Sequence, residues 1–220
     1  MGCGEMRYLI VAGGNVSDEF IAHVIKTGGF DVIIAADAGM EALYRCHVLP
    51  DIIVGDFDSV DAEILEHFRK KERIEICMLN PEKDDTDTEY AIREAIRRGA
   101  KEIAIVGGTG TRMDHVLGNI CLLGIGLEHG ITIHLVDEHN RIRMIDAPIT
   151  LQRQEQYGKY ISLIPFSEKV NGVTLEGFKY PLQNYTMGGF NSLGISNEII
   201  ADEAKISLAS GQLIVVESRD

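Results

Sequence analysis

The chain has 220 residues, of which 45% are hydrophobic and 25% charged, and its formal net charge at pH 7 is −13. This length allows one domain or two unequal domains, and the acidic balance argues against non-specific binding of nucleic acid, which depends on basic patches. No apolar run approaches the roughly 20 residues of a membrane-spanning helix, and the first residues lack the features of a signal peptide. We therefore expect a soluble, cytoplasmic protein that binds neither nucleic acid nor membrane.

The first two-thirds of the chain alternates strand patterns with helical patterns. Nearly unbroken apolar runs, typical of parallel strands covered on both faces, lie at residues 8–13, 31–36, 51–56, 74–79, 102–108 and 131–136. Helices are expected between them, at residues 17–27, 38–46, 61–71, 86–98 and 114–129. This alternation predicts an α/β N-terminal domain with a mainly parallel, Rossmann-like sheet.

After about residue 140 the pattern changes to short apolar segments separated by turn residues. These segments lie at residues 141–147, 149–154, 159–166, 172–178, 204–210 and 212–218. They show no convincing helical period and predict an all-β domain of the sandwich or barrel type. We place the boundary near residues 139–146, which gives domains of residues 1–140 and 141–220.

The four cysteines are scattered along the chain, at positions Cys3, Cys46, Cys77 and Cys121. No CxxC pair suggests zinc or a redox dithiol, and we expect small buried side chains rather than a disulfide framework.

Two aspartates, Asp56 and Asp58, end the apolar run of residues 51–56. Residues two apart on a strand point to the same side, so these carboxylates would repel each other unless a cation is present. A helix cap formed by Asp58 and Ser59 would explain only one of the two acids. A carboxylate pair at a strand end fits Mg²⁺, which takes hard oxygen ligands, and we expect a metal or catalytic site.

A second acidic segment precedes the helix expected from residue 86. Thr86 and Glu89 fit a capping box, and an acid near a helix N-terminus is favoured by the helix dipole. These structural roles do not explain why three aspartates lie within four residues: Asp84, Asp85 and Asp87. We expect at least one of them to be functional, because grouped carboxylates repel each other unless they share a cation.

A glycine-rich loop follows the strand expected at residues 102–108. Gly107, Gly108 and Gly110 suit a loop whose backbone N–H groups approach phosphate, although the lysine of a P-loop is missing. Arg112 is either a phosphate ligand or a solvated charge, and Asp114 is either functional or the N-cap of the next helix.

Five segments, in order along the chain, together resemble the thiamine pyrophosphokinases: AADAGMEAL, PDIIVGDFDS, KDDTDTEYAI, GGTGTRMDH and GISNE. The resemblance implies an enzyme that uses ATP and Mg²⁺ to transfer a pyrophosphoryl group to the hydroxyl of thiamine, giving thiamine diphosphate and AMP. It also implies an ATP-binding α/β domain, a thiamine-binding β-sandwich, and a homodimer with sites between domains and subunits.

The same resemblance assigns roles to residues of this chain. The catalytic residues would be Asp56, Asp58, Asp87 and Asp114, and the first three would also bind the metal. The ATP site would include Thr86, Arg112, Gly108 and Asp84, and thiamine would contact Ser196 and Asn197. Two points stay open: whether Asp87 or Asp114 accepts the proton of the hydroxyl, and which aromatic stacks on thiamine in a chain without tryptophan.

Two other functions use the same residues. The segment IIVGDFDSV also resembles the motif of haloacid-dehalogenase-type phosphatases, in which Asp56 would be the nucleophile. In those proteins the motif usually lies on the first strand, whereas here it lies on the third. The other alternative is a regulatory module that binds a nucleotide or thiamine without turnover, which would gain nothing from several mutually repelling carboxylates.

Overall fold

The structure is a computed structural model, and it describes residues 6–58, 60–80 and 85–220. Cys3, Ser59 and Asp84, to which the sequence assigned roles, lie outside the described residues. The chain divides into two compact units: one ends at Glu138 and the other spans His139–Asp220. Among the described residues, no helix is long and apolar enough to cross a membrane.

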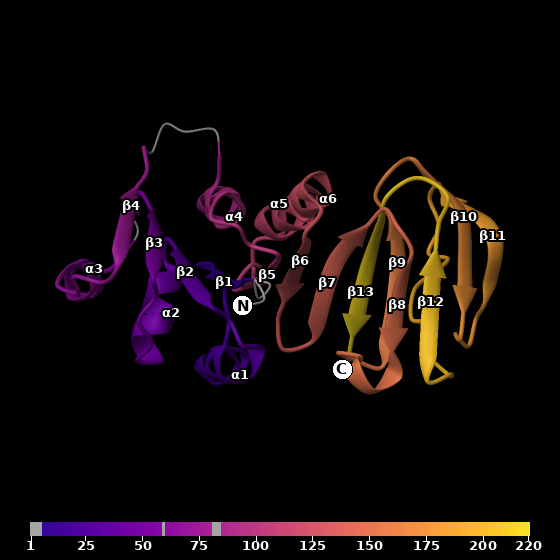
Figure 1. The fold of residues 1–220 in the computed structure, drawn as a ribbon, viewed down its shortest axis with the longest axis horizontal. Coiled ribbons are helices and arrows are strands. Elements are labelled where there is room, and N and C mark those ends of the chain that lie inside the picture. The colour runs from indigo at the N-terminus through magenta and orange to yellow at the C-terminus, as the bar shows by residue number, and fades with distance from the viewer. Residues whose placement is uncertain (1–5, 59, 81–84) are drawn as a thin grey trace, which may run out of the picture. The chain divides into compact units, whose positions relative to one another are not determined.

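The N-terminal unit alternates strands and helices (Figure 1). In chain order these are β1 (Arg7–Val11), α1 (Asp18–Gly28), β2 (Val32–Ala36), α2 (Gly39–Arg45), β3 (Ile52–Gly55), α3 (Ala62–Arg69), β4 (Glu75–Met78), α4 (Asp87–Arg97), β5 (Glu102–Val106), α5 (Met113–Leu122), α6 (Gly124–His129) and β6 (Thr132–Val136). The strand order is β4-β3-β2-β1-β5-β6, and each neighbouring pair is parallel. The expected Rossmann-like sheet is confirmed.

The strand order reverses between β1 and β5. From β1 the chain builds outward through β2 and β3 to β4, and it then returns to place β5 on the other side of β1. In Figure 1, α1 and α2 lie on one side of this sheet and α4 and α5 on the other. A crevice forms outside the carboxyl ends of the strands at such a switch point, because the loops that follow β1 and β5 lead to opposite faces.

The apolar runs form strands because they can be covered on both faces. In β1, Leu9, Ile10 and Val11 are fully buried, as are Ile53 and Val54 in β3. The edge strand β4 is less buried, since it has a partner on one side only. Unbroken apolar runs are typical of this arrangement.

The helix expected over residues 114–129 is two helices, α5 and α6, which meet at Leu123. The chain there uses tighter i to i−3 hydrogen bonds, from Leu123 N to Ile120 O (3.2 Å) and from Gly126 N to Leu123 O (3.1 Å). Two glycines, at positions 124 and 126, weaken the helical preference at this point. The expectation of one continuous helix was therefore wrong.

The C-terminal unit is built from antiparallel strands and one 3₁₀ turn (Arg153–Glu155). The strands are β7 (Asn140–Ile145), β8 (Ile149–Gln152), β9 (Tyr160–Pro165), β10 (Lys169–Glu176), β11 (Leu182–Gly188), β12 (Glu203–Ser207) and β13 (Leu213–Ser218). They pair in the orders β7-β13-β9 and β11-β10-β12-β8.

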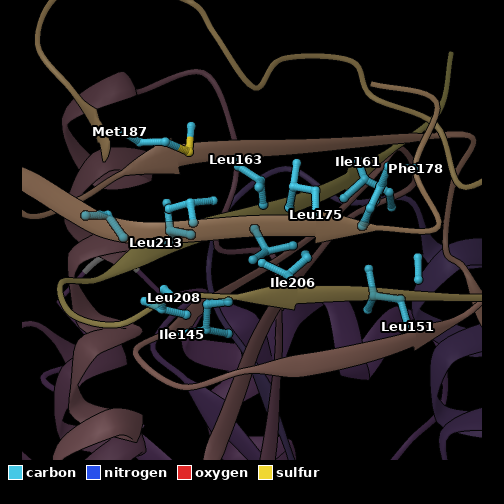
Figure 2. Packing of buried hydrophobic residues seen from close by; sticks show 14 of the residues in the cluster. Ile145, Leu151, Ile161, Leu163, Leu175, Phe178, Met187, Ile206, Leu208 and Leu213 are labelled. Atoms are coloured by element: carbon cyan, nitrogen blue, oxygen red, sulfur yellow. The ribbon is translucent and has the colours of Figure 1, made fainter. Parts of the chain in front are cut away.

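The two sets of strands share one hydrophobic core, which makes the C-terminal unit a β-sandwich. Leu163 and Leu213 come from one sheet, and Leu175 and Ile206 come from the other; Figure 2 shows them packed together. The all-β expectation is confirmed. Strand β11 was not expected, because it is an edge strand whose side chains are mostly exposed and show no apolar alternation.

The three described cysteines are free, as expected, but they differ in burial. Cys46 and Cys77 are half-buried, and desolvation raises the pKa of both thiols. Cys121 is exposed, so its expected burial was wrong. It lies on α5, in which no residue is buried although several side chains are apolar.

Candidate active site

A pocket of about 630 Å³ opens in the N-terminal unit at the switch point between β1 and β5. It is lined by the loops after β1, β2 and β5, by the start of α4 and by one face of α5. The lining segments are residues 12–16, 36–38, 86–88 and 107–112, together with Arg45, His115, Val116 and Asn119.

The loops after β1 and β5 touch each other through their backbones. Ala12 N donates to Val106 O (2.8 Å), and Gly14 N donates to Gly107 O (2.7 Å). A Cβ at Gly14 would lie 2.2 Å from Gly107 O, and one at Gly107, which has φ +69°, would lie 2.3 Å from Ala12 O. Only glycine fits at these two positions, which leaves peptide groups rather than side chains to line this part of the pocket.

The start of α4 also lines the pocket. Thr86 is the N-cap, and its Oγ1 accepts a hydrogen bond from Glu89 N (3.2 Å), as the capping box predicts. The Glu89 carboxylate bonds to Arg93 (2.7 Å). Thr86 and Asp87 are both in the pocket lining, where the positive end of the helix dipole favours an anion.

Helix α5 presents a stripe of side chains to the pocket at positions 112, 115, 116 and 119. Arg112 forms an ion pair with Asp114, with Nη2 and Oδ2 2.6 Å apart, and both side chains are mostly exposed. The hydrogen bond from Arg112 lowers the pKa of the Asp114 carboxyl. Asp114 is not in the pocket lining, and it is not the N-cap, because that position is Arg112.

Asp56 and Asp58 form a turn rather than neighbouring positions on a strand. Strand β3 ends at Gly55, Phe57 has φ +64°, and Asp56 Oδ1 accepts a hydrogen bond from Asp58 N (3.1 Å). The expectation that the two residues follow strand geometry was wrong, because the backbone leaves the extended conformation before Asp58 and closes an Asx turn. Neither residue is in the pocket lining.

Asp37 is a pocket residue that the sequence analysis did not select. It follows β2 with φ +47°, and its N–H donates to Val54 O at the end of β3 (2.8 Å). A Cβ at Gly55 would lie 3.2 Å from Asp37 Cα, so the turn that holds Asp56 begins against this residue. The signal was present, because Asp37 ends an apolar run as Asp56 does.

Further pocket residues were missed for a different reason. Asn15, His115 and Asn119 carry no carboxylate, and two of them, Asn15 and Asn119, lie outside the motifs selected above. The spacing from Arg112 through 115 and 116 to 119 nevertheless marks one helical face. Arg45 comes from α2 and pairs with Asp18 on α1 (Nε to Oδ1, 3.0 Å). Its place in the pocket depends on tertiary packing.

The carboxylates near the ends of β2 and β3 fit a Mg²⁺ ion by their chemistry. Asp37 and Asp56 follow neighbouring strands and supply hard oxygen donors. In the parts of the chain that the structure describes, no three His, Cys, Asp or Glu side chains are grouped closely enough to hold a metal ion. One or two carboxylates are enough for Mg²⁺ when substrate phosphates complete its shell.

Ser196 and Asn197 lie in the C-terminal unit, along the edge of β9. Ile161 and Asn197 exchange two backbone hydrogen bonds, at 2.8 and 3.0 Å. Ser196 has φ +58°, and its N–H donates to Ser162 Oγ (2.9 Å).

The amide of Asn197 is engaged inside this unit. Its Oδ1 accepts from Tyr180 N (3.0 Å) and Glu198 N (2.9 Å), and its Nδ2 donates to Tyr180 O (2.8 Å). Asn197 is only 4% exposed, whereas Tyr180 is 61% exposed. The side chain therefore fixes the backbone that carries an exposed aromatic ring.

Each of the two units matches a model of the same protein family. The family model for the catalytic domain of thiamin pyrophosphokinase matches residues 27–135, and the model for its vitamin B1 binding domain matches residues 147–213. The thiamine pyrophosphokinase of Bacillus subtilis (strain 168) is 36% identical over 213 residues, which cover 96% of this chain and 98% of that protein.

Crystal structures of proteins from the same family match this chain over nearly its whole length. A crystal structure of thiamine pyrophosphokinase from Bacillus subtilis has a TM-score of 0.86 at 35% identity, with 97% of this chain and 99% of that chain covered. A crystal structure of thiamin pyrophosphokinase from Geobacillus thermodenitrificans has a TM-score of 0.85 at 32% identity, with 98% of each chain covered. The chain therefore belongs to the thiamin pyrophosphokinase family.

Proposed function

We propose that the pocket of the N-terminal unit binds ATP and that the enzyme transfers the terminal pyrophosphoryl group of ATP to the hydroxyl of thiamine. The products are thiamine diphosphate and AMP. The observation that carries this proposal is the pocket of about 630 Å³, which lies at the switch point of the sheet and is lined by glycine loops. Its size falls within the range of small-molecule sites, and its position is where open α/β sheets bind nucleotides.

The chain's own residues supply positioning and charge for the phosphates. The glycine loop after β5 offers backbone N–H groups, and the start of α4 offers the positive end of a helix dipole. Arg112 is held by Asp114 at the rim, and the ion pair is exposed enough for the guanidinium to exchange one anionic partner for another. In phosphoryl chemistry these contributions, rather than covalent steps, supply most of the catalysis.

The proposal includes Mg²⁺, with Asp56, Asp58 and Asp87 as the residues that would hold it. When bound, the ion would neutralise part of the charge on the triphosphate. Asp37 joins this set as a candidate, since it lies in the pocket and its loop contacts the end of β3.

For the base that accepts the proton of the thiamine hydroxyl, the geometry favours Asp87 over Asp114. Asp87 is in the pocket lining and Asp114 is not.

Thiamine is proposed to bind the C-terminal unit through the segment that contains Ser196. Tyr180 is an exposed aromatic ring whose backbone is held by Asn197, next to Ser196 in sequence. These features support Tyr180 as the aromatic that stacks on a thiamine ring, a point that the sequence left open. The homodimer and the cytoplasmic location remain predictions from the sequence.

The test is to incubate the protein with ATP, Mg²⁺ and thiamine and to separate the products by chromatography. We expect AMP and thiamine diphosphate in equal amounts, and no AMP when thiamine is omitted. Release of inorganic phosphate without thiamine, with a phosphorylated Asp56, would support the phosphatase alternative and overturn the proposal. Binding of ATP without thiamine-dependent AMP would support the regulatory module instead.

A further inference from the structure

The loop after β5 is held by three successive carbonyl groups. Val106 O accepts from Ala12 N (2.8 Å), Gly107 O from Gly14 N (2.7 Å), and Gly108 O from the side-chain Nδ2 of Asn119 (2.7 Å). The first two donors are backbone N–H groups and depend on no side chain. The third depends on the identity of one residue on α5.

The bond from Asn119 sets the direction of a peptide group in the pocket. A trans peptide points its C=O and its N–H in opposite directions, and the described residues contain no cis peptide bond. Fixing Gly108 O towards Asn119 therefore aims the N–H of Thr109 away from that residue. The described chain contains no hydrogen bond from the backbone N–H groups of residues 108–111 to another residue, so these donors are available for a ligand.

Helix α5 has few other means of holding this loop. None of its residues is buried, and space beside Gly118 is open. The Asn119 side chain is half-buried against the loop and lies in the pocket lining together with Gly108. The amide thus links the helix to the peptide groups that face the ligand.

We propose that Asn119 is a positioning residue that orients the backbone N–H groups of the glycine loop towards the phosphates of ATP. This inference rests on the proposed function, because it assumes that the pocket binds the triphosphate. Asn119 acts through the Gly108–Thr109 peptide and touches neither the phosphates nor the thiamine hydroxyl. Its loss should weaken the binding of phosphate groups specifically and leave the binding of the nucleoside unchanged.

The test compares Asn119→Leu with the wild-type enzyme by calorimetric titration with ATP, inorganic triphosphate and adenosine, in the absence of thiamine. Leucine has nearly the shape of asparagine, carries no charge and cannot donate. We expect the Kd for ATP and for triphosphate to rise about tenfold or more, as loss of an oriented set of donors predicts. The Kd for adenosine and the KM for thiamine should stay within about twofold of wild type.

Asn191→Leu is the matched control. The Nδ2 of Asn191 donates to Gly188 O (2.8 Å), the same kind of bond, but in the C-terminal unit and on an exposed segment. The Asn191→Leu variant should bind ATP with the affinity of the wild-type enzyme. If Asn119→Leu fails to fold, Asn119→Ala removes the same donor with less bulk.

Wild-type affinity for triphosphate in a folded Asn119 variant would overturn the inference, as would equal losses for adenosine and triphosphate. The proposed function would survive either result, because the wild-type enzyme would still bind ATP. A wild-type protein that binds neither ATP nor triphosphate would instead overturn the proposed function, and this inference with it.

Discussion

The aspartates at the ends of β2 and β3 show how a single residue acquires a role from its backbone. Asp37 is directed into the pocket region by a left-handed backbone conformation, and Asp56 closes a turn on Asp58 N. Both follow an apolar run, so they look equivalent in the sequence. Their separation into a pocket residue and a turn residue comes from the backbone around them.

We predict that Asp56→Asn and Asp58→Asn each lower kcat about a hundredfold or more, because each removes a charge proposed to face the metal. The fold should persist, since asparagine at position 56 can form the same Asx turn and Asp58 contributes only its backbone N–H to that turn. Steady-state kinetics at saturating Mg²⁺, with the melting temperature as a check on folding, tests this.

Asp61→Asn is the matched control for these variants. Asp61 caps α3, where its Oδ1 accepts from Glu63 N (2.8 Å), and asparagine caps equally well. The kcat of the Asp61→Asn variant should be close to that of the wild-type enzyme. Near-wild-type rates in both the Asp56 and Asp58 variants would remove the metal assignment.

We predict that Asn197→Ala lowers the free energy of unfolding by about 1–3 kcal/mol, because it removes a buried amide that makes three hydrogen bonds to backbone groups of Tyr180 and Glu198. The KM for thiamine should rise as Tyr180 loses its support, while the KM for ATP stays unchanged. Urea denaturation and kinetics with each substrate varied separately measure both effects.

Asn191→Ala is the control variant at an exposed site, because the Asn191 amide also makes two hydrogen bonds to backbone groups. It should change the free energy of unfolding by less than about 0.5 kcal/mol. If Asn197→Ala raised the KM for thiamine with unchanged stability, Asn197 would contact thiamine directly and the supporting role would be wrong.

At the scale of elements, α4 is anchored by ion pairs at the end that lies away from the pocket. Its first residues line the pocket, and its last turn carries Glu94, whose Oε1 accepts from Arg97 (2.5 Å) and Arg98 (2.6 Å). Arg98 also pairs with Glu75 on β4 (2.6 Å), which joins the helix to the edge strand. This network anchors the helix that carries Thr86 and Asp87.

We predict that Glu94 makes stability depend on pH in the acid range. The hydrogen bond from Arg97 is the main cause that lowers the pKa of Glu94 from 4.5 to about 2. Because the folded pKa is the lower one, the stabilisation is fully present above about pH 4.5 and is lost as the pH falls towards 2. Glu94→Gln should lower the free energy of unfolding by about 3 kcal/mol at pH 7 and by less at pH 3.

Urea unfolding of both proteins at the two pH values measures this difference. Glu66→Gln is the control, because Glu66 forms an exposed pair with Lys70 (3.7 Å) that should contribute less than about 0.5 kcal/mol. A cost for Glu94→Gln that is the same at pH 3 and pH 7 would show that its charge is not responsible.

At the scale of the whole molecule, the isolated chain leaves large apolar side chains exposed in each unit. Met113 and Leu117 are 62% and 58% exposed on α5, and Phe166 and Phe190 are exposed in the C-terminal unit. Exposed apolar groups of this kind often mark protein interfaces. They support the homodimer that the family resemblance implies.

We predict that sedimentation will give a mass twice the 24.3 kDa of the chain. Exposed apolar side chains would be covered by a second copy, and activity per chain should fall on dilution when the dimer dissociates. Sedimentation and activity measured over the same range of concentrations test this. A monomer that keeps full activity at nanomolar concentration would contradict a site shared between subunits.

The sequence alone determined the type of each unit and most of its elements. Strands such as β1 and β3 were predicted because a strand buried on both faces needs an unbroken apolar run. The cap at Thr86 and the glycine loop were predicted because their chemistry is local. The segments that identify the family are short stretches of the same kind, at strand ends and helix starts.

Tertiary structure decided which of these local features meet. The sheet order brings the loop at Gly14 against the loop at Gly107, although 93 residues separate them, and it places Asp37 in the pocket and Asp114 outside it. The bonds from Asn119 to Gly108 and from Asn197 to Tyr180 join elements whose sequences give no sign of each other. Local propensity reaches only a few residues along the chain, whereas these contacts exist because separate elements bury their apolar faces together and bring distant polar groups within bonding distance.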